Sequence, residues 1–460
     1  MNELKKKYGL LTAICMVVGI VIGSGVFFKA TPVFTNNGGN MLSSILTVLT
    51  VGALMTTCAY TFSLLAGKYS KVNGIVDYAE AEVGNGLAYA LGWFISVIYY
   101  PVIASTLAWV SANYTCSLFK IESANIRLII TASYLTLSFL LNIVSPKLSG
   151  KFQVSTTFIK LIPLLIMAIV GTVVGISNGQ TLENLTADTA AMTASSGSFF
   201  GAIVAFAFAY EGWIIATCIN AELHDAKKNL PKALIIGTLI VISVYIAYFI
   251  GIASVLSTKE IMEAGDNLPK IAFTRLLGGN EIFGTIAYVF IIISCLGTMN
   301  GVMMGNCRGL YALAARNQGP APKKLAKLHD KWNMPVISAL IGFAISAVWM
   351  LQWEFGLIRG KLPAFIAWEN DELPIITLYA LYIPIFINMM IKSKGMHPLK
   401  RFVFPAISIA ACLFMIFCAF YAYKIQAVYY LIIFAVIMLV GLMFYRDNKG
   451  RSVIYKFFYK

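Results

Sequence analysis

The sequence predicts an all-α membrane protein with twelve transmembrane helices, and three observations support this prediction. Hydrophobic residues make up 59% of the 460-residue chain and charged residues only 12%, about half the charged share of a soluble domain. Apolar runs of about 20 residues recur along the chain, and each is long enough to cross a bilayer. Lys and Arg residues gather in alternate connecting segments, which is typical of membrane proteins.

Twelve apolar runs are expected to form the helices, with short connections and no soluble domain between them. They cover residues 8–29, 41–66, 86–113, 127–144, 150–176, 197–219, 232–256, 282–314, 335–352, 370–391, 402–423 and 425–445. The first run is too long for a removable signal peptide and lacks a small-residue cleavage site. The stretch 67–85 has mixed charge and is expected to form an interfacial helix. We therefore expect one transmembrane domain over 1–460.

The net charge of +15 is interpreted as a topology signal. With the N-terminus in the cytoplasm, 25 of the 35 Lys and Arg residues lie inside, nine lie outside, and Lys160 lies within a run. This bias fits twelve spans with both termini cytoplasmic. We expect the protein to lie in the plasma membrane. The basic balance adds attraction to anionic lipid and does not indicate nucleic-acid binding.

Metal chemistry and enzymatic catalysis are not expected. The eight cysteines lie almost entirely in apolar runs, no pair has metal-ligand spacing, and the three histidines fall in predicted cytoplasmic loops. The cysteines are interpreted as small hydrophobic residues. We expect no cofactor, because the sequence contains neither a catalytic cluster nor a soluble output domain.

The first apolar run is interrupted at its middle by Gly23-Ser24-Gly25. A helix that spans a bilayer normally satisfies its own backbone hydrogen bonds. An unwound stretch at mid-depth frees N–H groups, which can bind a small anion such as a carboxylate. The alternative is close helix packing through small residues, which is common in membranes.

A second interruption is predicted in the sixth run, within Phe208-Ala209-Tyr210-Glu211-Gly212-Trp213. The two breaks correspond if residues 1–176 and 197–391 are repeats of five spans each. Five is an odd number, so the second repeat would be inverted in the membrane, and residues 402–445 would add two helices. Paired broken helices in inverted repeats indicate a substrate site at the midplane, which favours a transporter.

Glu211 and Lys160 are the two charged residues that need an explanation at membrane depth. Glu211 should face a cavity or a partner; it is interpreted as a proton-coupling group or as a structural acid that bonds the unwound backbone. Lys160 lies about 10–14 Å from the cytoplasmic end of its run. It either snorkels to that surface or holds a fixed ammonium against carbonyls of a broken helix, in the place of a cation such as Na⁺.

Three further motifs have both a functional and a packing interpretation. Cys295 and Asn300 lie in a small and polar stretch, 294–301, which either contacts substrate or joins helices. Tyr100 precedes Pro101 and could line a cavity or only pack. The acids of 369–372 precede a predicted helix start, where they complement the helix dipole or act as an extracellular gate.

Together these motifs resemble the amino acid–polyamine–organocation transporter superfamily, and most closely its L-type amino acid transporter branch with its bacterial exchangers. The resemblance runs from about Tyr8 to Arg446. Its most specific parts are 19–27, 208–213, the hairpin ending at 229–231, and 297–301. It implies the leucine-transporter fold, with a five-plus-five inverted repeat and two extra helices.

The resemblance also implies roles for individual residues. The substrate carboxylate would meet the N–H groups of Ser24 and Gly25 and the Ser24 hydroxyl. The ammonium would meet carbonyls of Val21, Ile22 and the 208–211 stretch, and Phe208 would be an aromatic gate. Lys160 matches the lysine that replaces the sodium site in sodium-independent members.

Cys116 falls near the position where animal relatives carry a cysteine that is bonded to a partner subunit. Nothing else in the sequence indicates such a partner, and Cys116 is equally explained as apolar filling.

We therefore expect a secondary transporter of L-amino acids that works by alternating access, as a sodium-independent exchanger. The site residues are expected to be Val21, Ile22, Gly23, Ser24, Gly25, Tyr100, Phe208, Ala209, Glu211, Cys295 and Asn300, with Lys160 as the substitute for sodium. Two alternatives have the same fold: a proton-coupled symporter that uses Glu211, and a carrier of polyamines or other amines.

Overall fold

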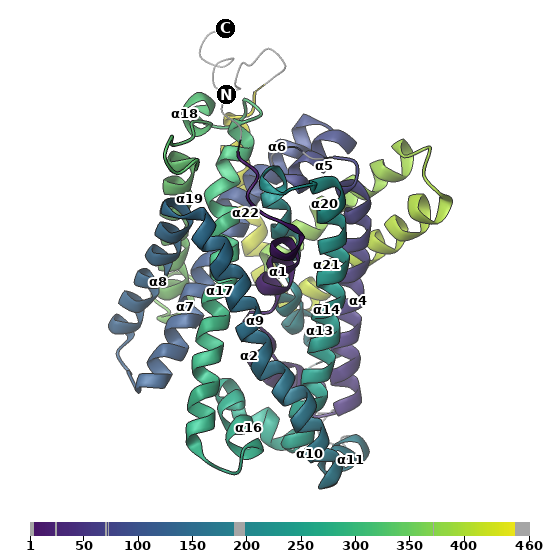
Figure 1. The fold of residues 1–460 in the computed structure, drawn as a ribbon, viewed down its shortest axis with the longest axis vertical. Helices are drawn as coiled ribbons and strands as arrows, with labels where there is room; N and C mark the ends of the chain where they lie inside the picture. The colour runs from purple at the N-terminus through teal and green to yellow at the C-terminus, as the bar shows by residue number, and fades with distance from the viewer. Residues whose placement is uncertain are drawn as a thin grey trace.

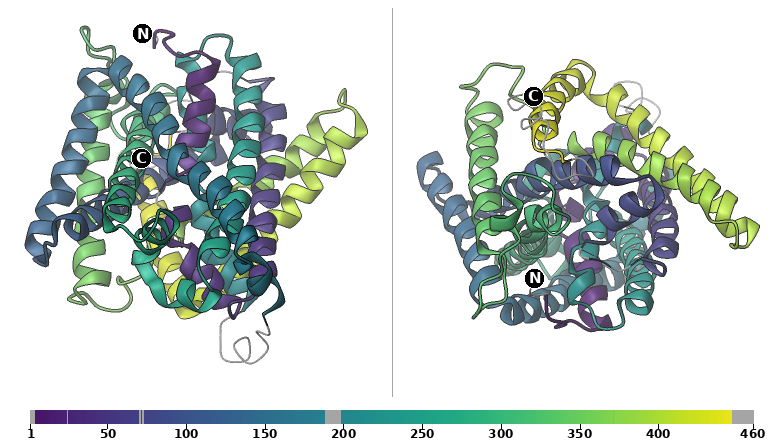
Figure 2. Two further views of the ribbon diagram at one scale, coloured as in Figure 1. Left: turned by 60° about the horizontal axis from the view of Figure 1, so that its bottom comes forward. Right: turned by 90° about the horizontal axis from the view of Figure 1, so that it is seen from above.

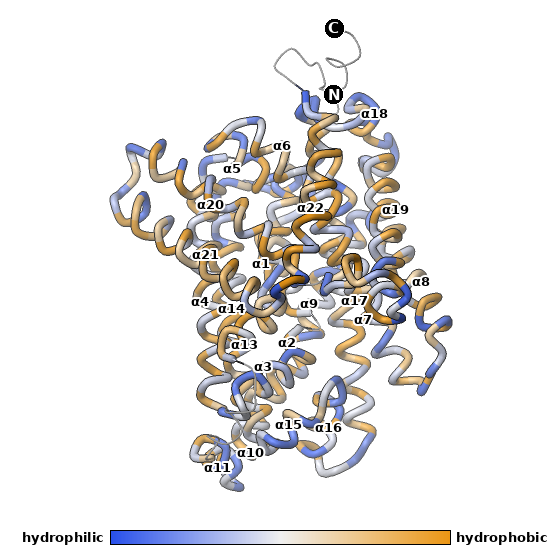
Figure 3. The backbone as a smooth tube through the Cα atoms, turned by 180° about the vertical axis from the view of Figure 1, so that it is seen from behind, coloured by the Kyte–Doolittle hydropathy of each residue, from blue (hydrophilic) through white to orange (hydrophobic). Residues whose placement is uncertain are grey.

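The structure is a computed structural model, and it describes residues 4–446 except 24, 70, 72, 188–197 and 371. Within these ranges the regular structure is helical, apart from isolated bridge positions, among them the pair Tyr8 and Leu223. Among the described residues, twelve helical segments are long and apolar enough to cross a membrane, as the sequence predicts. Figure 1 shows them packed side by side, and Figure 3 shows hydrophobic positions along their middles with hydrophilic ones at ends and turns.

The spanning segments combine α-helices with short 3₁₀ and π turns (η). In chain order they are α1 (Leu10–Val21) with α2 (Gly25–Phe28); α4 (Met41–Ala66); α6 (Asn85–Phe94) with η1 (Ile95–Tyr99) and α7 (Tyr100–Phe119); α8 (Ala124–Val144); α9 (Pro146–Ile166) with η2 (Met167–Gly171) and α10 (Thr172–Ser177); α13 (Phe199–Ala207) with η3 (Phe208–Tyr210) and η4 (Trp213–Glu222); α14 (Ala226–Val255); α17 (Glu281–Ala314); α19 (Val336–Gln352) with η6 (Trp353–Ile358); α20 (Pro374–Lys392); η7 (Leu399–Val403) with α21 (Phe404–Tyr423); and α22 (Ile425–Met443).

Shorter helices connect the spans. They are α3 (Ala30–Asn36), α5 (Gly74–Glu82), α11 (Gln180–Thr186), α15 (Thr258–Ala264), η5 (Gly265–Asn267), α16 (Leu268–Leu276) and α18 (Pro322–Leu325). Helix α5 lies within 67–85, where the mixed charge predicts a helix.

The two interrupted spans occupy the centre of the bundle. Buried residues make up 76% of the apolar window of the Leu10–Phe28 span and 94% of that of Phe199–Glu222, against 17% in the last span, Ile425–Met443. Helix α1 packs against α9, α14, α17 and η4, and the left view of Figure 2 shows this purple helix between neighbouring helices. Unwound backbone is tolerated at membrane depth only where protein or a water-filled cavity surrounds it. The two interrupted spans must therefore lie inside the bundle, as they do.

Both described ends of the chain lie at the same face, beside the connection between α17 and α19. The Lys5 amide donates to Asn333 Oδ1 at 3.1 Å, and the Gln318 side chain donates to the Arg446 carbonyl at 2.9 Å. An even number of spans places both ends on one side, as the sequence predicts.

Candidate functional site

The two helix breaks face each other across very short distances. A Cβ atom at Gly25 would lie 2.7 Å from the Ala209 Cα, and one at Gly23 would lie 2.9 Å from the Thr298 hydroxyl. Gly212 has φ +100°, and a Cβ there would lie 2.6 Å from Ile20 Cγ2. Gly25 and Gly212 thus allow the two unwound segments to meet, Gly212 also through a positive φ that favours glycine, and Gly23 allows the close approach of α17.

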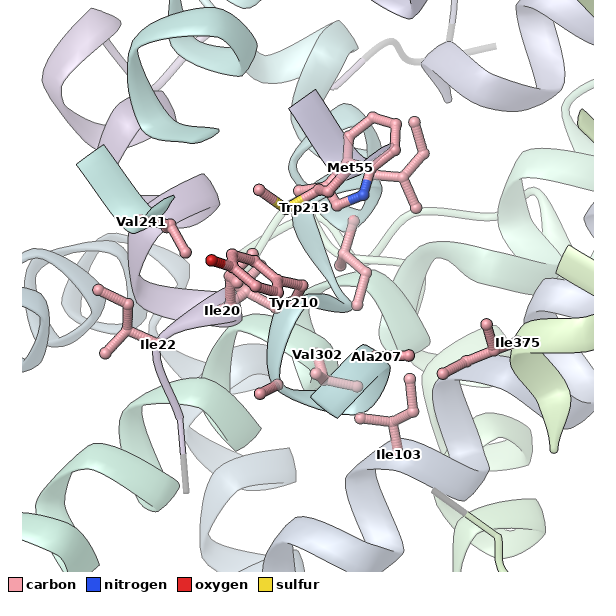
Figure 4. Close-up of a cluster of buried hydrophobic side chains, with 14 of the residues drawn as sticks. Ile20, Ile22, Met55, Ile103, Ala207, Tyr210, Trp213, Val241, Val302 and Ile375 are labelled. Carbon is pink, nitrogen blue, oxygen red and sulfur yellow. The ribbon is translucent and has the colours of Figure 1, made fainter. Parts of the chain in front are cut away.

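A small cavity lies between the breaks. Its volume is about 20 Å³, and its lining consists of Ile20, Val21, Gly23, Gly25, Ile103, Leu107, Phe208, Glu211, Gly212, Thr298 and Val302. This volume corresponds to about one water molecule, so the conformation is closed around the site. Figure 4 shows Ile103 and Val302 among the buried apolar side chains that surround the breaks.

Lys160 holds the end of α1. Its Nζ atom donates to the carbonyls of Gly19 and Ile22 at 2.6 Å each, and to the Thr298 hydroxyl at 3.0 Å. The side chain is fully buried, which excludes the snorkelling interpretation. The ammonium lies against carbonyls at the end of a broken helix, as the second interpretation of Lys160 expects, and its role as a substitute for sodium stays a prediction.

The Ile22 carbonyl lies at the same end of α1. It accepts from Lys160 at 2.6 Å, and the Thr298 hydroxyl lies 3.2 Å from it and 2.9 Å from the Gly19 carbonyl. One hydroxyl has one proton to donate, so Thr298 bonds one of these carbonyls at a time. The contact between Ile22 and a substrate ammonium that the resemblance implies stays a prediction.

Tyr245 connects the two breaks directly. Its hydroxyl lies 2.9 Å from the Val21 carbonyl and 2.8 Å from the Ala209 carbonyl. One hydroxyl has one proton to donate, so it bonds one carbonyl at a time or shares its proton between them. Val21 and Ala209 thus keep acceptor capacity on either side of the cavity.

Glu211 lines the cavity and is bonded on its inner side. The Tyr99 hydroxyl donates to its Oε2 at 2.9 Å, and the Gly212 amide lies 3.4 Å from the same atom. The acid is therefore anchored to the unwound backbone and also forms part of the cavity wall.

An outer layer of polar contacts covers Phe208. The Lys29 ammonium lies 5.0 Å from the Phe28 ring centre and 5.7 Å from that of Phe208. Lys29 also pairs with Glu372, which accepts a hydrogen bond from the Tyr423 hydroxyl. We call Lys29, Glu372 and Tyr423 the outer latch. It includes one of the acids of 369–372; Asp371 lies outside the described residues.

An inner latch closes the opposite side, and we define it as Lys7, Glu222 and Arg308. Lys7 Nζ lies 3.1 Å from Glu222 Oε2, and Arg308 Nε donates to Glu222 Oε1. Glu222 and Arg308 are almost fully buried. Nearby, Arg316 pairs with Asp77. Burial raises the pKa of Asp77 to about 6, although the charge of Arg316 opposes this shift.

The structure brings together most of the predicted site residues. Val21, Gly23, Gly25, Phe208 and Glu211 line the cavity. Ile22 and Ala209 lie beside it through the contacts described above. The position of Ser24 falls outside the described residues.

Three predicted wall residues, Tyr100, Cys295 and Asn300, do not line this cavity. The Asn300 amide donates to the Ser149 carbonyl and to Gln153 Oε1. It lies two residues from Thr298, which places it on the far side of α17.

Tyr100 packs against Gly305, and Cys295 is fully buried. In this closed conformation the three residues lie outside the cavity lining, and their role as wall residues stays a prediction.

Sequence reasoning missed Ile103 and Leu107, which lie four residues apart and so share one helix face, on which Tyr99 also lies. That spacing was the available signal. It also missed Tyr245, for which the sequence offers no signal, because its role depends on how α14 crosses the two breaks.

Comparison with known proteins gives consistent matches. The model of the family described as amino acid permease matches residues 8–443. The serine/threonine exchanger SteT of Bacillus subtilis (strain 168) is 30% identical over 400 residues, which are 87% of this chain and 86% of that protein. The cystine/glutamate transporter of Homo sapiens is 26% identical over 429 residues, covering 91% and 81% of the two chains. The large neutral amino acids transporter small subunit 2 of Rattus norvegicus is 29% identical over 360 residues, covering 76% and 64%.

Proposed function

The chain belongs to the amino acid permease family, and from that premise we propose that it exchanges neutral L-amino acids across the plasma membrane by alternating access. The observation that supports this proposal most directly is the pair of helix breaks around one cavity. Broken helices present N–H groups at one end and carbonyls at the other. A site of this kind recognises the carboxylate and ammonium that every amino acid shares.

The carboxylate would bind at the N-terminal end of α2, around Ser24 and Gly25. The ammonium would bind the carbonyls of Val21 and Ala209, which retain acceptor capacity beside Tyr245. The side chain would lie against Ile103, Leu107 and Val302, an aliphatic wall that favours a neutral side chain. The name of the serine/threonine exchanger, at 30% identity, is consistent with a small neutral substrate.

Sodium independence is proposed from the contacts of Lys160. Its ammonium donates hydrogen bonds to the carbonyls of Gly19 and Ile22. Without it, a bound cation would be needed to satisfy these oxygens at the end of α1. A covalently attached charge stays in place through the transport cycle, so no sodium gradient would be needed.

The two latches support alternating access. The outer latch lies over Phe208, and the inner latch joins the N-terminal segment to η4 and α17. With both closed and a cavity of about 20 Å³ between them, an amino acid can enter only after one latch opens. We propose that residues 1–176 and 197–391 are the inverted repeats that move, with 402–445 outside them.

Topology and subunit composition are part of the same proposal. Both termini would be cytoplasmic, in agreement with the bias of Lys and Arg. We also propose that the chain works without a disulfide-linked partner, since Cys116 is 5% exposed and packs within α7.

The test is labelled amino acid uptake into proteoliposomes. Uptake should require unlabelled amino acid inside and should proceed equally in sodium-free buffer. Failure to take up any amino acid under either condition would overturn the proposal.

One observation favours a second candidate, a proton-coupled symporter. Glu211 combines burial at mid-membrane with direct access to the cavity. Uptake that needs an inward proton gradient but no internal amino acid would establish this alternative.

A further inference from the structure

A second, larger cavity opens at the face that carries the N-terminal segment. Its volume is about 890 Å³, within the range of about 300–1,000 Å³ that ligand sites occupy. It is lined by the N-terminal segment, α5, α6, η4, α14 and α17. We call it the inner vestibule.

The inner vestibule is strongly electropositive. Five basic side chains line it, Lys6, Lys71, Lys227, Lys228 and Arg316, against the two acids Glu80 and Asp225. Lys71 pairs with Glu80 at 3.1 Å and Arg316 pairs with Asp77, whereas the other three lysines have no ion pair within the part of the chain that the structure describes. Uncompensated charges of one sign in a cavity concentrate ligands of the opposite sign.

Two helix starts add to this positive potential. The first turns of α6, at Asn85, and of α14, at Ala226, both line the vestibule. The N-terminal end of a helix carries a partial positive charge and free N–H groups. A carboxylate is the kind of group that such a surface attracts.

The vestibule also offers a negative charge for an ammonium. Asp225 lies in its lining and carries that charge. Asn220 lies in the same lining; its side chain is 2% exposed, and its amide nitrogen donates to Asp77 Oδ2 at 3.5 Å.

The vestibule and the central cavity lie along the same two elements. Segment η4 begins directly after Gly212, which lines the central cavity, and contributes Asn220 to the vestibule. Helix α17 contributes Val302 to the central cavity and Tyr311 to the vestibule. Tyr311 lies nine positions after Val302, which is about 13–14 Å along the helix. The inner latch residues Glu222 and Arg308 lie on these same elements.

We propose that the inner vestibule binds the amino acid on the cytoplasmic side before it enters the central cavity. Lys6, Lys227 and Lys228 attract the carboxylate, and Asp225 receives the ammonium. This inference rests on the proposed function, because it assumes that an amino acid is the transported substrate. It adds a cytoplasmic binding step that lies outside the broken-helix site.

The experiment measures exchange in proteoliposomes of known orientation, with substrate varied on one side at a time. The double variant Lys227→Gln/Lys228→Gln should raise the KM at the vestibule face at least about threefold at low salt, because two attracting charges are lost. The KM at the opposite face and kcat should stay unchanged. Lys6→Gln, on a separate segment, should also raise the KM at the vestibule face. This variant keeps the inference testable if the double variant does not fold.

The matched control is Lys323→Gln/Lys324→Gln, which removes two neighbouring lysines on α18 that do not line the vestibule. An equal rise in KM for this control would overturn the inference, because the effect would then come from general surface charge. An unchanged KM in both vestibule variants would also overturn it. If the unaltered protein exchanges no amino acid, the proposed function itself fails, and this outcome is distinct from the other two.

Discussion

The ammonium of Lys160 donates a hydrogen bond of 2.6 Å to the carbonyl of Ile22, at the point where α1 ends inside the membrane. The same ammonium bonds Gly19 at equal distance. A side chain from α9 thus closes the backbone of a broken helix that would otherwise expose carbonyls to an apolar environment.

The first prediction concerns this contact. Lys160→Met should reduce exchange at least about tenfold, because two buried carbonyls lose their donor at about 1–3 kcal/mol each. Lys151→Met, at the exposed start of the same helix, should leave the rate within about twofold, as expected for a surface substitution. Initial exchange rates in sodium-containing and sodium-free buffer measure both effects. A sodium requirement in the unaltered protein would refute the proposed role of Lys160.

The second prediction concerns the close approach of the two breaks. Gly25→Ala should abolish exchange, because the new Cβ would lie 2.7 Å from the Ala209 backbone, and overpacking costs about 1–3 kcal/mol. Gly395→Ala is the control, since nothing lies within 4 Å of a Cβ there. The exchange rate of each variant is measured per amount of folded protein, and thermal unfolding in detergent checks that Gly25→Ala and Gly395→Ala are both folded. Normal exchange by Gly25→Ala would place the site elsewhere.

The third prediction distinguishes exchange from proton symport. Glu211→Gln should retain exchange within a few fold, because a glutamine oxygen can still accept from Tyr99, whereas Glu211→Leu should lose it by leaving that hydroxyl unpaired. Uptake is measured with and without a proton gradient. If the unaltered protein accumulates substrate in response to the gradient and Glu211→Gln does not, the symporter alternative is correct.

The fourth prediction concerns the outer latch. In a Val302→Cys background, Glu372→Gln should accelerate labelling by a membrane-impermeant thiol reagent added outside. Breaking a buried ion pair costs about 3–5 kcal/mol. If only about 1.4 kcal/mol of this cost destabilises the closed state relative to the open state, the open population rises tenfold. The eight native cysteines are buried, so they give a low background.

Two controls accompany this labelling experiment. Glu281→Gln breaks an exposed pair with Lys270 and should have no effect on the rate. Glu222→Gln, in the inner latch, should accelerate labelling only from the other side. Equal acceleration from both sides by either latch variant would mean that the latches do not gate separate faces.

The fifth prediction is a pH dependence. The pKa of Asp77 is raised to about 6 from an ordinary value near 3.8, so its charged form is disfavoured in the folded protein. The folded state then binds the proton more tightly, and stability rises as the pH falls from 7 towards 5. Asp77→Asn should remove this contribution. The thermal unfolding midpoint of the unaltered protein in detergent, minus that of Asp77→Asn, should therefore increase as the pH falls. A difference between the two midpoints that does not change with pH would contradict the prediction.

The sequence determined the spans and the place of the breaks, because both depend on local composition. Apolar runs set the helices, and Gly23, Gly25 and Gly212 mark where the backbone can unwind. Lys160 and Glu211 stood out because charge is costly within a membrane. These features can be recognised without knowing which helices are neighbours.

Only the tertiary structure decided which side chains meet. Glu222 and Arg308 are 86 positions apart, and Lys29 and Glu372 are 343 apart, so no local pattern pairs them. The side of the helix that faces the cavity was equally undetermined: Asn300 lies on the far face of α17 and Thr298 on the face that lines the cavity. Two residues along a helix rotate a side chain by about 200°, and only the packing of α17 against α1 and α9 sets that phase.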